Sequence, residues 1–202
     1  MKGILLLNGL PYGGEIDARG ARVYCCDGAY KWAKGKVEIY KNIGDFDSLA
    51  ETPFPLPDEI YPAEKNFTDG EIALRKMLAD GIDEIDVYGA FGGREDHFLG
   101  NIQLLYYALE RGAKMRLISE STIIYAAKGR AEFCGLQGKT VSVFPFSSPL
   151  HILDSKGLKY SYPEAIGYGE CRGVSNIVTE QSAYVDFRDG DTALILINRG
   201  SV

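Results

Sequence analysis

The sequence has few of the residues that build metal, disulfide or membrane-spanning structures. Its 202 residues include two histidines, too few for a histidine-rich metal site, and four cysteines that form no CxxC pair. We therefore expect reduced thiols in a cytoplasmic protein, with neither a structural zinc site nor a disulfide framework. No apolar run approaches the length of a membrane span, and the N-terminal stretch does not resemble a signal peptide. These absences predict a protein that makes no membrane contact.

Positive charge is also scarce. Lys and Arg number 22 against 28 Asp and Glu, which gives a formal net charge of −6. Binding to a nucleic-acid backbone needs a basic surface, so this balance argues against a nucleic-acid partner. Hydrophobic residues make up 46% of the chain and charged residues 25%, as in ordinary folded proteins. An acidic protein of this kind that handles phosphates must hold them with metal ions and a few well-placed cations.

The chain is patterned in two ways, which predicts two domains. In the first part, short apolar runs alternate with helical patterns, as is typical of a mostly parallel sheet flanked by helices. In the second part, short alternating runs are separated by turn residues, which predicts an antiparallel β-sandwich. We therefore expect an α/β domain over residues 1–119 and an all-β antiparallel sandwich domain over residues 120–202.

Polar residues follow several of the predicted strands of the first domain. Asn8, Asp27, Asp45 and the loop after Gly89 all fall at such strand ends. Ligands of parallel sheets bind outside the carboxyl ends of the strands. We therefore expect these residues to converge on one edge of the sheet.

The segment GDFDS at 44–48 places two acids one residue apart. Asp45 and Asp47 would lie on the same side of an extended chain. Alone, the segment is typical of a turn, because Gly, Asp and Ser favour turns. Two carboxylates about 4 Å apart repel by roughly 4 kcal/mol at an effective dielectric of 20, so a cleft that also held Asp27 and Asp69 would need cations. Mg²⁺ prefers carboxylate oxygens together with substrate phosphates, so it suits such a cleft.

The segment KNFTDGEIAL at 65–74 predicts the start of a helix. Thr68 and Glu71 have the spacing of a capping box, which explains both residues without any function. The cap does not explain Asp69 or Lys65, although an acid in the first helical turn is favoured by the helix dipole. Lys65 is a candidate for neutralising phosphate oxygens.

The segment GGREDHFLGNIQLL at 92–105 predicts a helix from about Arg94 to Glu110. One stripe of this helix is polar near its start and apolar further on: His97, Asn101, Leu104, Leu105 and Ala108. Two glycines before the helix allow close backbone approach, and helix N-termini suit phosphates. We interpret this as a helix whose N-terminus faces a ligand.

With these segments placed, the sequence resembles the thiamine pyrophosphokinases. The resemblance lies in the three segments above and extends to GLKY at 157–160 and GVSN at 173–176. It implies transfer of the pyrophosphoryl group of ATP to the hydroxyl of thiamine, giving thiamine diphosphate and AMP, with Mg²⁺ as cofactor. It also implies a homodimer whose active sites lie at the subunit interface, with residues 1–119 binding ATP and Mg²⁺ and residues 120–202 binding thiamine.

The resemblance also implies roles for particular residues. Those that match catalytic positions are Asp45, Asp47, Asp69 and Asp96, the first three as metal ligands. Those expected to bind ATP are Asp27, Lys65, Arg94 and Asn101, and those expected to bind thiamine are Ser175, Asn176 and Tyr160. Either Asp96 or Asp69 would orient or deprotonate the thiamine hydroxyl. One departure is DGAYK, where the family usually has DGGAN, so the family pattern is not kept at Ala29 and Tyr30.

Three alternatives explain part of the pattern. A haloacid-dehalogenase-like phosphatase also carries Asp-x-Asp after a strand, but on its first strand. A metal-dependent glycosyltransferase uses Asp-x-Asp for a sugar nucleotide, but leaves GGREDH unexplained. A non-catalytic nucleotide or thiamine sensor would need the same binding residues, so turnover alone separates it from an enzyme.

Overall fold

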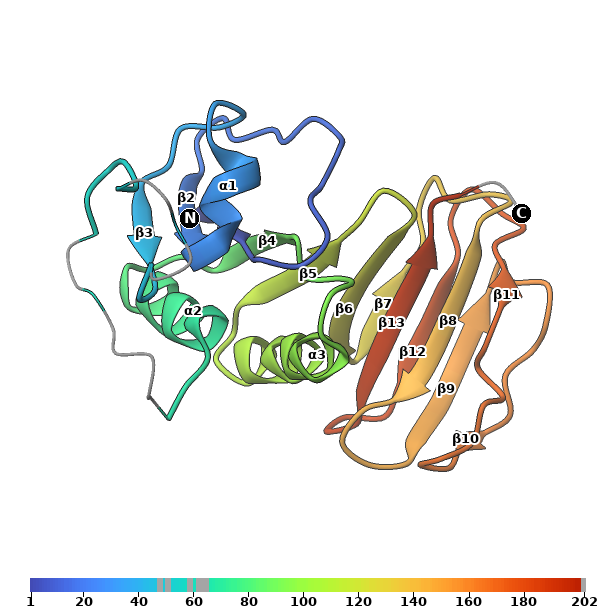
Figure 1. Cartoon of the computed structure of the whole chain (residues 1–202). Coiled ribbons are helices and arrows are strands. Elements are labelled where there is room, and N and C mark those ends of the chain that lie inside the picture. The colour runs from blue at the N-terminus through green and yellow to red at the C-terminus, as the bar shows by residue number, and fades with distance from the viewer. Residues whose placement is uncertain (47–48, 50–51, 58–59, 61–65, 201–202) are drawn as a thin grey trace. The chain divides into compact units, whose positions relative to one another are not determined.

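The computed structural model of the chain describes residues 1–46, 49, 52–57, 60 and 66–200. The chain divides into two compact units, Met1–Ser119 and Glu120–Val202. In Figure 1 the first unit runs from blue to green and the second continues to red. Among the described residues, no helix has the length and apolarity that a membrane crossing requires.

The first unit contains the expected parallel sheet. Its strands are β1 (Lys2–Leu6), β2 (Arg22–Cys26), β3 (Lys41–Ile43), β4 (Glu84–Tyr88) and β5 (Lys114–Ile118). They lie in the order β5-β4-β1-β2-β3, and each neighbouring pair is parallel. The carboxyl ends of all these strands therefore meet at the same edge.

Helices cover both faces of this sheet, as Figure 1 shows. They are η1 (Asp27–Ala29), α1 (Tyr30–Ala33), α2 (Asp69–Ala79) and α3 (Glu95–Leu109). On one face, Tyr30 and Ala33 pack into a buried cluster with strand residues such as Ile4. On the other, α2 lies so close to β1 that a Cβ on Gly3 would be 2.6 Å from Met77 Cε. The helix predicted to begin near Arg94 is α3, which starts one residue later.

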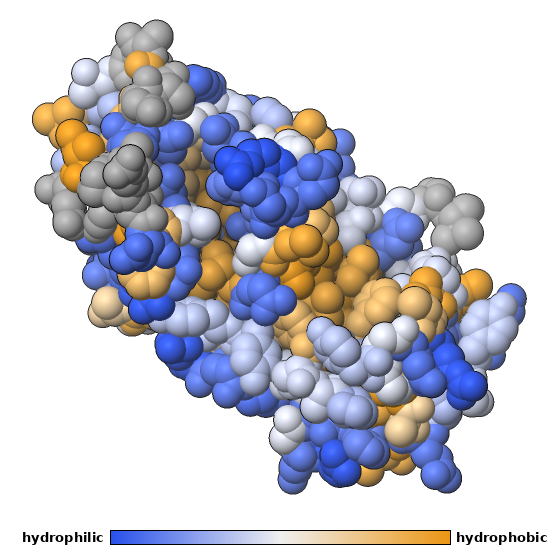
Figure 2. Space-filling model, turned by 60° about the horizontal axis from the view of Figure 1, so that its bottom comes forward, coloured by the Kyte–Doolittle hydropathy of each residue, from blue (hydrophilic) through white to orange (hydrophobic). Residues whose placement is uncertain are grey.

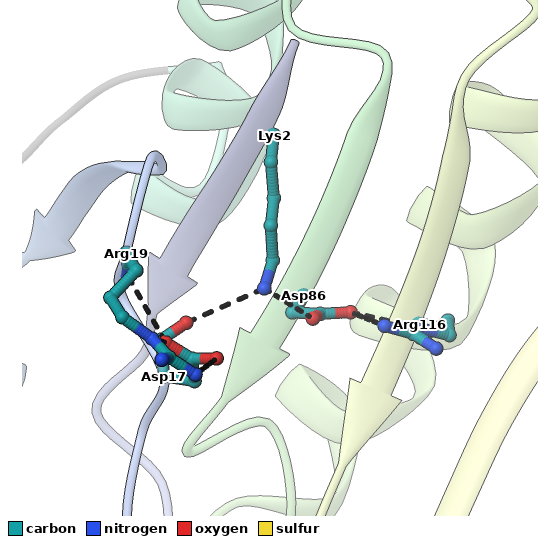
Figure 3. Close-up of polar contacts among 5 residues, drawn as sticks. All are labelled: Lys2, Asp17, Arg19, Asp86 and Arg116. Carbon is teal, nitrogen blue, oxygen red and sulfur yellow. Dashed lines mark hydrogen bonds and ion pairs between the residues drawn. The ribbon is translucent and has the colours of Figure 1, made fainter.

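One buried acid on β4 is neutralised by cations. Asp86 is 6% exposed. Its Oδ1 accepts a hydrogen bond from Nε of Arg116 on β5 at 2.8 Å, and its Oδ2 lies 3.9 Å from Lys2 Nζ (Figure 3). A buried carboxylate needs such partners, because an unpaired charge in the interior is strongly destabilising. This network lies away from the carboxyl ends of the strands and explains Asp86 without a functional role.

The second unit consists of two antiparallel sheets. One has the order β11-β8-β13-β6 and the other β10-β9-β12-β7. The strands are β6 (Thr122–Lys128), β7 (Arg130–Glu132), β8 (Thr140–Pro145), β9 (Leu150–Lys156), β10 (Ala165–Ile166), β11 (Asn176–Ile177), β12 (Tyr184–Phe187) and β13 (Thr192–Asn198). Side chains from both sheets, including Val143 and Val185, belong to one buried cluster. The antiparallel β character is as predicted, and the sandwich arrangement stays a prediction.

Candidate functional site

A cavity of about 390 Å³ opens in the first unit, at the carboxyl-end edge of the sheet. It is lined by residues at the carboxyl ends of β1, β2 and β4 and in the N-terminal halves of α2 and α3: Leu7, Asn8, Gly9, Cys26, Asp27, Thr68, Asp69, Gly70, Gly89, Ala90, Gly92, Gly93, Arg94, His97 and Asn101. Parallel sheets bind ligands at this edge. Of the predicted site residues, Asp27, Asp69, Arg94 and Asn101 therefore share one cavity.

Backbone contacts join the loops that follow β1 and β4. The amide of Gly9 donates to the carbonyl of Gly89 at 2.8 Å, and the amide of Leu10 donates to the carbonyl of Phe91 at 2.6 Å. Gly89 has a φ of +72°, and a Cβ at that position would lie 2.1 Å from the carbonyl oxygen of Leu7. Only glycine fits there. The hydrogen bonds between the two loops make them one continuous wall of the cavity.

Asp27 holds a strained position at the end of β2. Its φ is +39°, and the φ of Phe46, just beyond β3, is +57°. Non-glycine residues in this region cost roughly 1–3 kcal/mol, and such strain gathers at functional sites. Gly44 lies against Asp27, since a Cβ on Gly44 would be 2.9 Å from the Cβ of Asp27. The ends of β2 and β3 therefore meet, which brings Gly44, the first residue of the GDFDS segment, beside Asp27.

Asp69 is the first residue of α2 and faces the cavity. The preceding Thr68 caps the helix, because its Oγ1 accepts a hydrogen bond from the amide of Glu71 at 3.2 Å. The carboxylate of Glu71 accepts a bond from Arg75 at 2.8 Å. Capping thus accounts for Thr68, as predicted, while Asp69 contributes a buried Oδ1 to the cavity wall. The helix dipole favours a carboxylate there.

Arg94 and Asp96 form a two-point ion pair at the start of α3. Arg94 Nε donates to Asp96 Oδ1 at 3.1 Å, and Nη2 donates to Oδ2 at 2.6 Å. The backbone amide of His97 also donates to Asp96 Oδ1, at 2.9 Å. The bond to Arg94 lowers the pKa of Asp96 and raises the pKa of Arg94. Arg94 and His97 line the cavity, whereas Asp96 does not line it and is bonded to Arg94.

Two asparagines complete the polar wall. Asn101 Nδ2 donates to the carbonyl of Ala90 at 3.0 Å, which fixes α3 to the loop after β4. Asn8 packs directly on Gly28, where a Cβ would lie 2.2 Å from Asn8 Nδ2. Asn8 and His97 have no assigned role in the predicted site. The sequence signal for Asn8 is that a polar residue directly follows a predicted strand. The signal for His97 is its place at the polar end of the helical stripe.

Other predicted residues lie elsewhere. Asp45 follows β3 and is not one of the cavity-lining residues. Asp47 and Lys65 fall outside the described residues. Ala29 and Tyr30, which depart from the family pattern, are buried in the core, and the Tyr30 hydroxyl accepts a hydrogen bond from the amide of Phe54 at 3.1 Å.

The three predicted thiamine-binding residues lie in the second unit. Tyr160 is 54% exposed, whereas Asn176 is 4% exposed. Ser175 is exposed and has a φ of +59°, and its amide donates to Oγ of Ser142 at 3.0 Å. The polar atoms of Asn176 are bonded to the backbone of Tyr160.

The cavity offers carboxylate oxygens, which are the ligands that a magnesium ion prefers. Within the described residues, no group of three or more His, Cys, Asp and Glu side chains could hold a metal ion. Asp27 and Asp69, however, each bury a carboxylate oxygen in the wall of one cavity. Mg²⁺ usually takes one or two carboxylates and completes its shell with water and substrate phosphates. Two carboxylates beside an anionic ligand therefore fit this ion.

Family models match both units. The description "Thiamin pyrophosphokinase, catalytic domain" matches residues 18–117, and "Thiamin pyrophosphokinase, vitamin B1 binding domain" matches residues 122–190. The thiamine pyrophosphokinase of Bacillus subtilis (strain 168) is 34% identical over 161 residues, which cover 75% of each chain.

Solved structures show the same likeness. A crystal structure of thiamine pyrophosphokinase from Bacillus subtilis superposes with a TM-score of 0.83 at 28% identity, over 100% of both chains. A family protein from Enterococcus faecalis superposes with a TM-score of 0.84 over 100% of both chains, and its 20% identity supports the fold alone.

Proposed function

We propose a function for each part of this chain, which belongs to the thiamine pyrophosphokinase family. Members transfer the pyrophosphoryl group of ATP to the hydroxyl of thiamine. The chain is accordingly an enzyme that acts on thiamine and a nucleotide to form thiamine diphosphate. The cytoplasmic location stays a prediction from the sequence.

The cavity of the first unit is the site for the ATP phosphates. The observation that carries this proposal is the convergence of two helix N-termini, the Arg94 guanidinium and the carboxylates of Asp27 and Asp69 on one cavity. Helix N-termini and arginine attract phosphate oxygens, whereas carboxylates repel them unless a cation lies between. A nucleotide bound with Mg²⁺ satisfies both kinds of group.

Asp27 and Asp69 would hold the magnesium ion, and the predicted ligands Asp45 and Asp47 would complete the set. Bound Mg²⁺ would neutralise these carboxylates and draw charge from the phosphates. The strained backbone of Asp27 supports this assignment, because strain of this kind gathers at functional sites.

The transfer forms a bond between the thiamine hydroxyl oxygen and the β-phosphorus of ATP. The bond from that phosphorus to the oxygen shared with the α-phosphate breaks, and AMP leaves with the electron pair. Arg94 binds phosphate oxygens as charge moves toward the leaving group. Of the two carboxylates proposed to orient the thiamine hydroxyl or take its proton, Asp69 faces the cavity and Asp96 is bonded to Arg94. We therefore assign this role to Asp69.

The second unit would bind thiamine and a second copy of the chain. Three half-buried apolar side chains, Ala126, Leu194 and Phe144, lie side by side across β6, β13 and β8. An apolar sheet face of this kind supports a subunit interface. Figure 2 shows hydrophobic side chains, in orange, in several areas of one face of the molecule. A homodimer with active sites at the interface would join the phosphate site of one subunit to the thiamine site of the other.

The activity is tested by incubating the protein with ATP, thiamine and Mg²⁺. We expect AMP and thiamine diphosphate in equal amounts, and we expect a chelator to stop both. Release of inorganic phosphate without AMP would instead indicate a phosphatase. Binding of both substrates without turnover would indicate a sensor.

A second prediction separates the roles of Asp96 and Arg94. If Asp96 acts by orienting Arg94, Asp96→Asn should lower kcat/KM for ATP by about tenfold, and Arg94→Ala by about a hundredfold or more. The double variant should then be no worse than Arg94→Ala alone, because both changes remove the same interaction. If Asp96 were the base, its loss would add to the loss of Arg94.

The chain offers a matched control for this experiment. Asp17 and Arg19 form the same two-point pair at the same spacing, with both nitrogen–oxygen distances at 2.8 Å (Figure 3). This pair is exposed and does not line the cavity. Asp17→Asn should therefore leave the kinetics unchanged.

A further inference from the structure

The segment before Tyr160 pairs with the strand that contains Asn176. Leu158 and Val178 form an antiparallel bridge, and the amide of Lys159 donates to the carbonyl of Ile177 at 2.9 Å. In this antiparallel direction, the next residue along, Tyr160, comes to lie beside Asn176. The backbone of Asn176 is paired with Val141 of β8 on its other side.

The side chain of Asn176 continues this pairing by one residue. Its Oδ1 accepts a hydrogen bond from the amide of Tyr160 at 3.0 Å, and its Nδ2 donates to the carbonyl of Tyr160 at 2.7 Å. The carboxamide thus does what a neighbouring peptide group would do in a sheet. Because Asn176 is buried, losing it would leave polar backbone groups of Tyr160 without these partners, which is costly in the interior.

The ring of Tyr160 is held differently from its backbone. The residue is 54% exposed although its amide and carbonyl are both fixed. The Lys159 ammonium lies over the ring, 5.3 Å from its centroid, so the ring already makes contact with a cation. A large aromatic group that is exposed and fixed at its backbone loses little entropy on contact with a ligand.

We propose that Asn176 is a positioning residue, which fixes the backbone of Tyr160 so that its exposed ring forms one wall for the cationic thiamine. This inference rests on the proposed function. It gives Asn176 a different part from the direct substrate contact that the sequence predicts. The side-chain carboxamide of Asn176 is bonded to the backbone of Tyr160, and its Oδ1 also accepts a hydrogen bond from the amide of Ile177 at 2.9 Å. The ring of Tyr160 meets the substrate.

The first test measures the positioning itself and needs no activity. Hydrogen exchange of the Tyr160 amide should be slow in the wild-type protein and at least about tenfold faster in Asn176→Ala. Asn176→Asp keeps the Oδ1 acceptor but loses the Nδ2 donor, so it should give a smaller increase. Unchanged exchange at Tyr160 in a folded variant would overturn the proposal.

Asn198→Ala is the matched control. Asn198 ends β13, and its Oδ1 also accepts a backbone hydrogen bond, from Gly200 at 3.0 Å. The change therefore removes one side chain–backbone bond in the same unit without touching Tyr160. Exchange at Tyr160 should stay at the wild-type rate.

The second test separates positioning from direct contact. Asn176→Ala and Tyr160→Ala should each raise the KM for thiamine by about tenfold and leave the KM for ATP unchanged. The double variant should be no worse than Tyr160→Ala, because Asn176 acts through that ring. A further rise in the double variant would show that Asn176 contacts thiamine directly and would overturn the proposal.

The Asn176→Asp variant serves the same kinetic comparison if Asn176→Ala does not fold. Failure of the underlying function is recognised separately. A wild-type protein that forms no thiamine diphosphate from ATP and thiamine would overturn the proposed function. The exchange result at Tyr160 would still report whether Asn176 holds the Tyr160 backbone.

Discussion

Asp69→Asn should lower kcat by about a thousandfold while leaving the fold intact, because it removes one charge from the cavity with almost no change in volume. The carboxylate has two tasks in the proposed mechanism, to hold the magnesium ion and to orient the thiamine hydroxyl. The amide that replaces it has no negative charge and accepts no proton from the substrate. Steady-state kinetics at saturating ATP, thiamine and Mg²⁺ would measure the loss.

The stability of this variant should change little. Losing an acid at the first position of α2 costs roughly 0.3–1 kcal/mol of dipole interaction. Removing a charge from the cavity that also holds Asp27 relieves repulsion of similar size, so the two effects oppose each other. A change of 1 kcal/mol in the free energy of unfolding shifts the melting temperature by about 4–8 °C in small domains and by less in larger ones. We therefore expect the melting temperature without ligands to stay within a few degrees of wild type.

Two comparisons give the result its meaning. Glu95 occupies the same first position in α3, but it is exposed and does not line the cavity, so Glu95→Gln should keep wild-type kcat. Thr68→Ala removes the cap of α2 and should cost about 1 kcal/mol of stability. It should lower kcat far less than Asp69→Asn. If Asp69→Asn and Thr68→Ala lost stability and activity in parallel, Asp69 would be part of the cap and not of the site.

Patterns that repeat along the chain carried most of what the sequence predicts. The apolar runs that alternate with helices specify the parallel sheet, and the polar residues after those runs then meet at one edge. The start of α2 is readable because Thr68 and Glu71 are three residues apart and capping is a local interaction. The cavity follows from these elements, since Asp27, Asp69 and Arg94 all lie at strand ends or helix starts.

Contacts between distant or neighbouring side chains are what the sequence leaves open. Nothing in the spacing of Arg94 and Asp96 shows that they bind each other, because two residues at the start of a helix can point in several directions. The pairing of Asn176 with Tyr160 spans 16 residues and depends on how the loop between them folds. The predicted site therefore contains residues that position other residues as well as residues that face the ligand.

Mixing two impaired variants should restore activity if the subunits share their sites. One variant is Asp69→Asn, which damages the phosphate site of the first unit, and the other is Tyr160→Ala, which damages the proposed thiamine site of the second. In a shared-site heterodimer, one active site carries both changes and the other carries neither. Complete subunit exchange at equal amounts makes half of the dimers heterodimers, so about a quarter of wild-type activity should return.

The assay must be run at a thiamine concentration well below the KM of Tyr160→Ala, so that this variant alone contributes little. The control mixes untagged Asp69→Asn with tagged Asp69→Asn. Every dimer then lacks Asp69, so no activity should return. Subunit exchange is followed by capturing the tagged chain and detecting its untagged partner. If exchange is complete and activity stays at the level of the separate variants, each subunit contains its own complete site. In that case every subunit in the mixture carries one of the two changes within its own site, so no intact site forms.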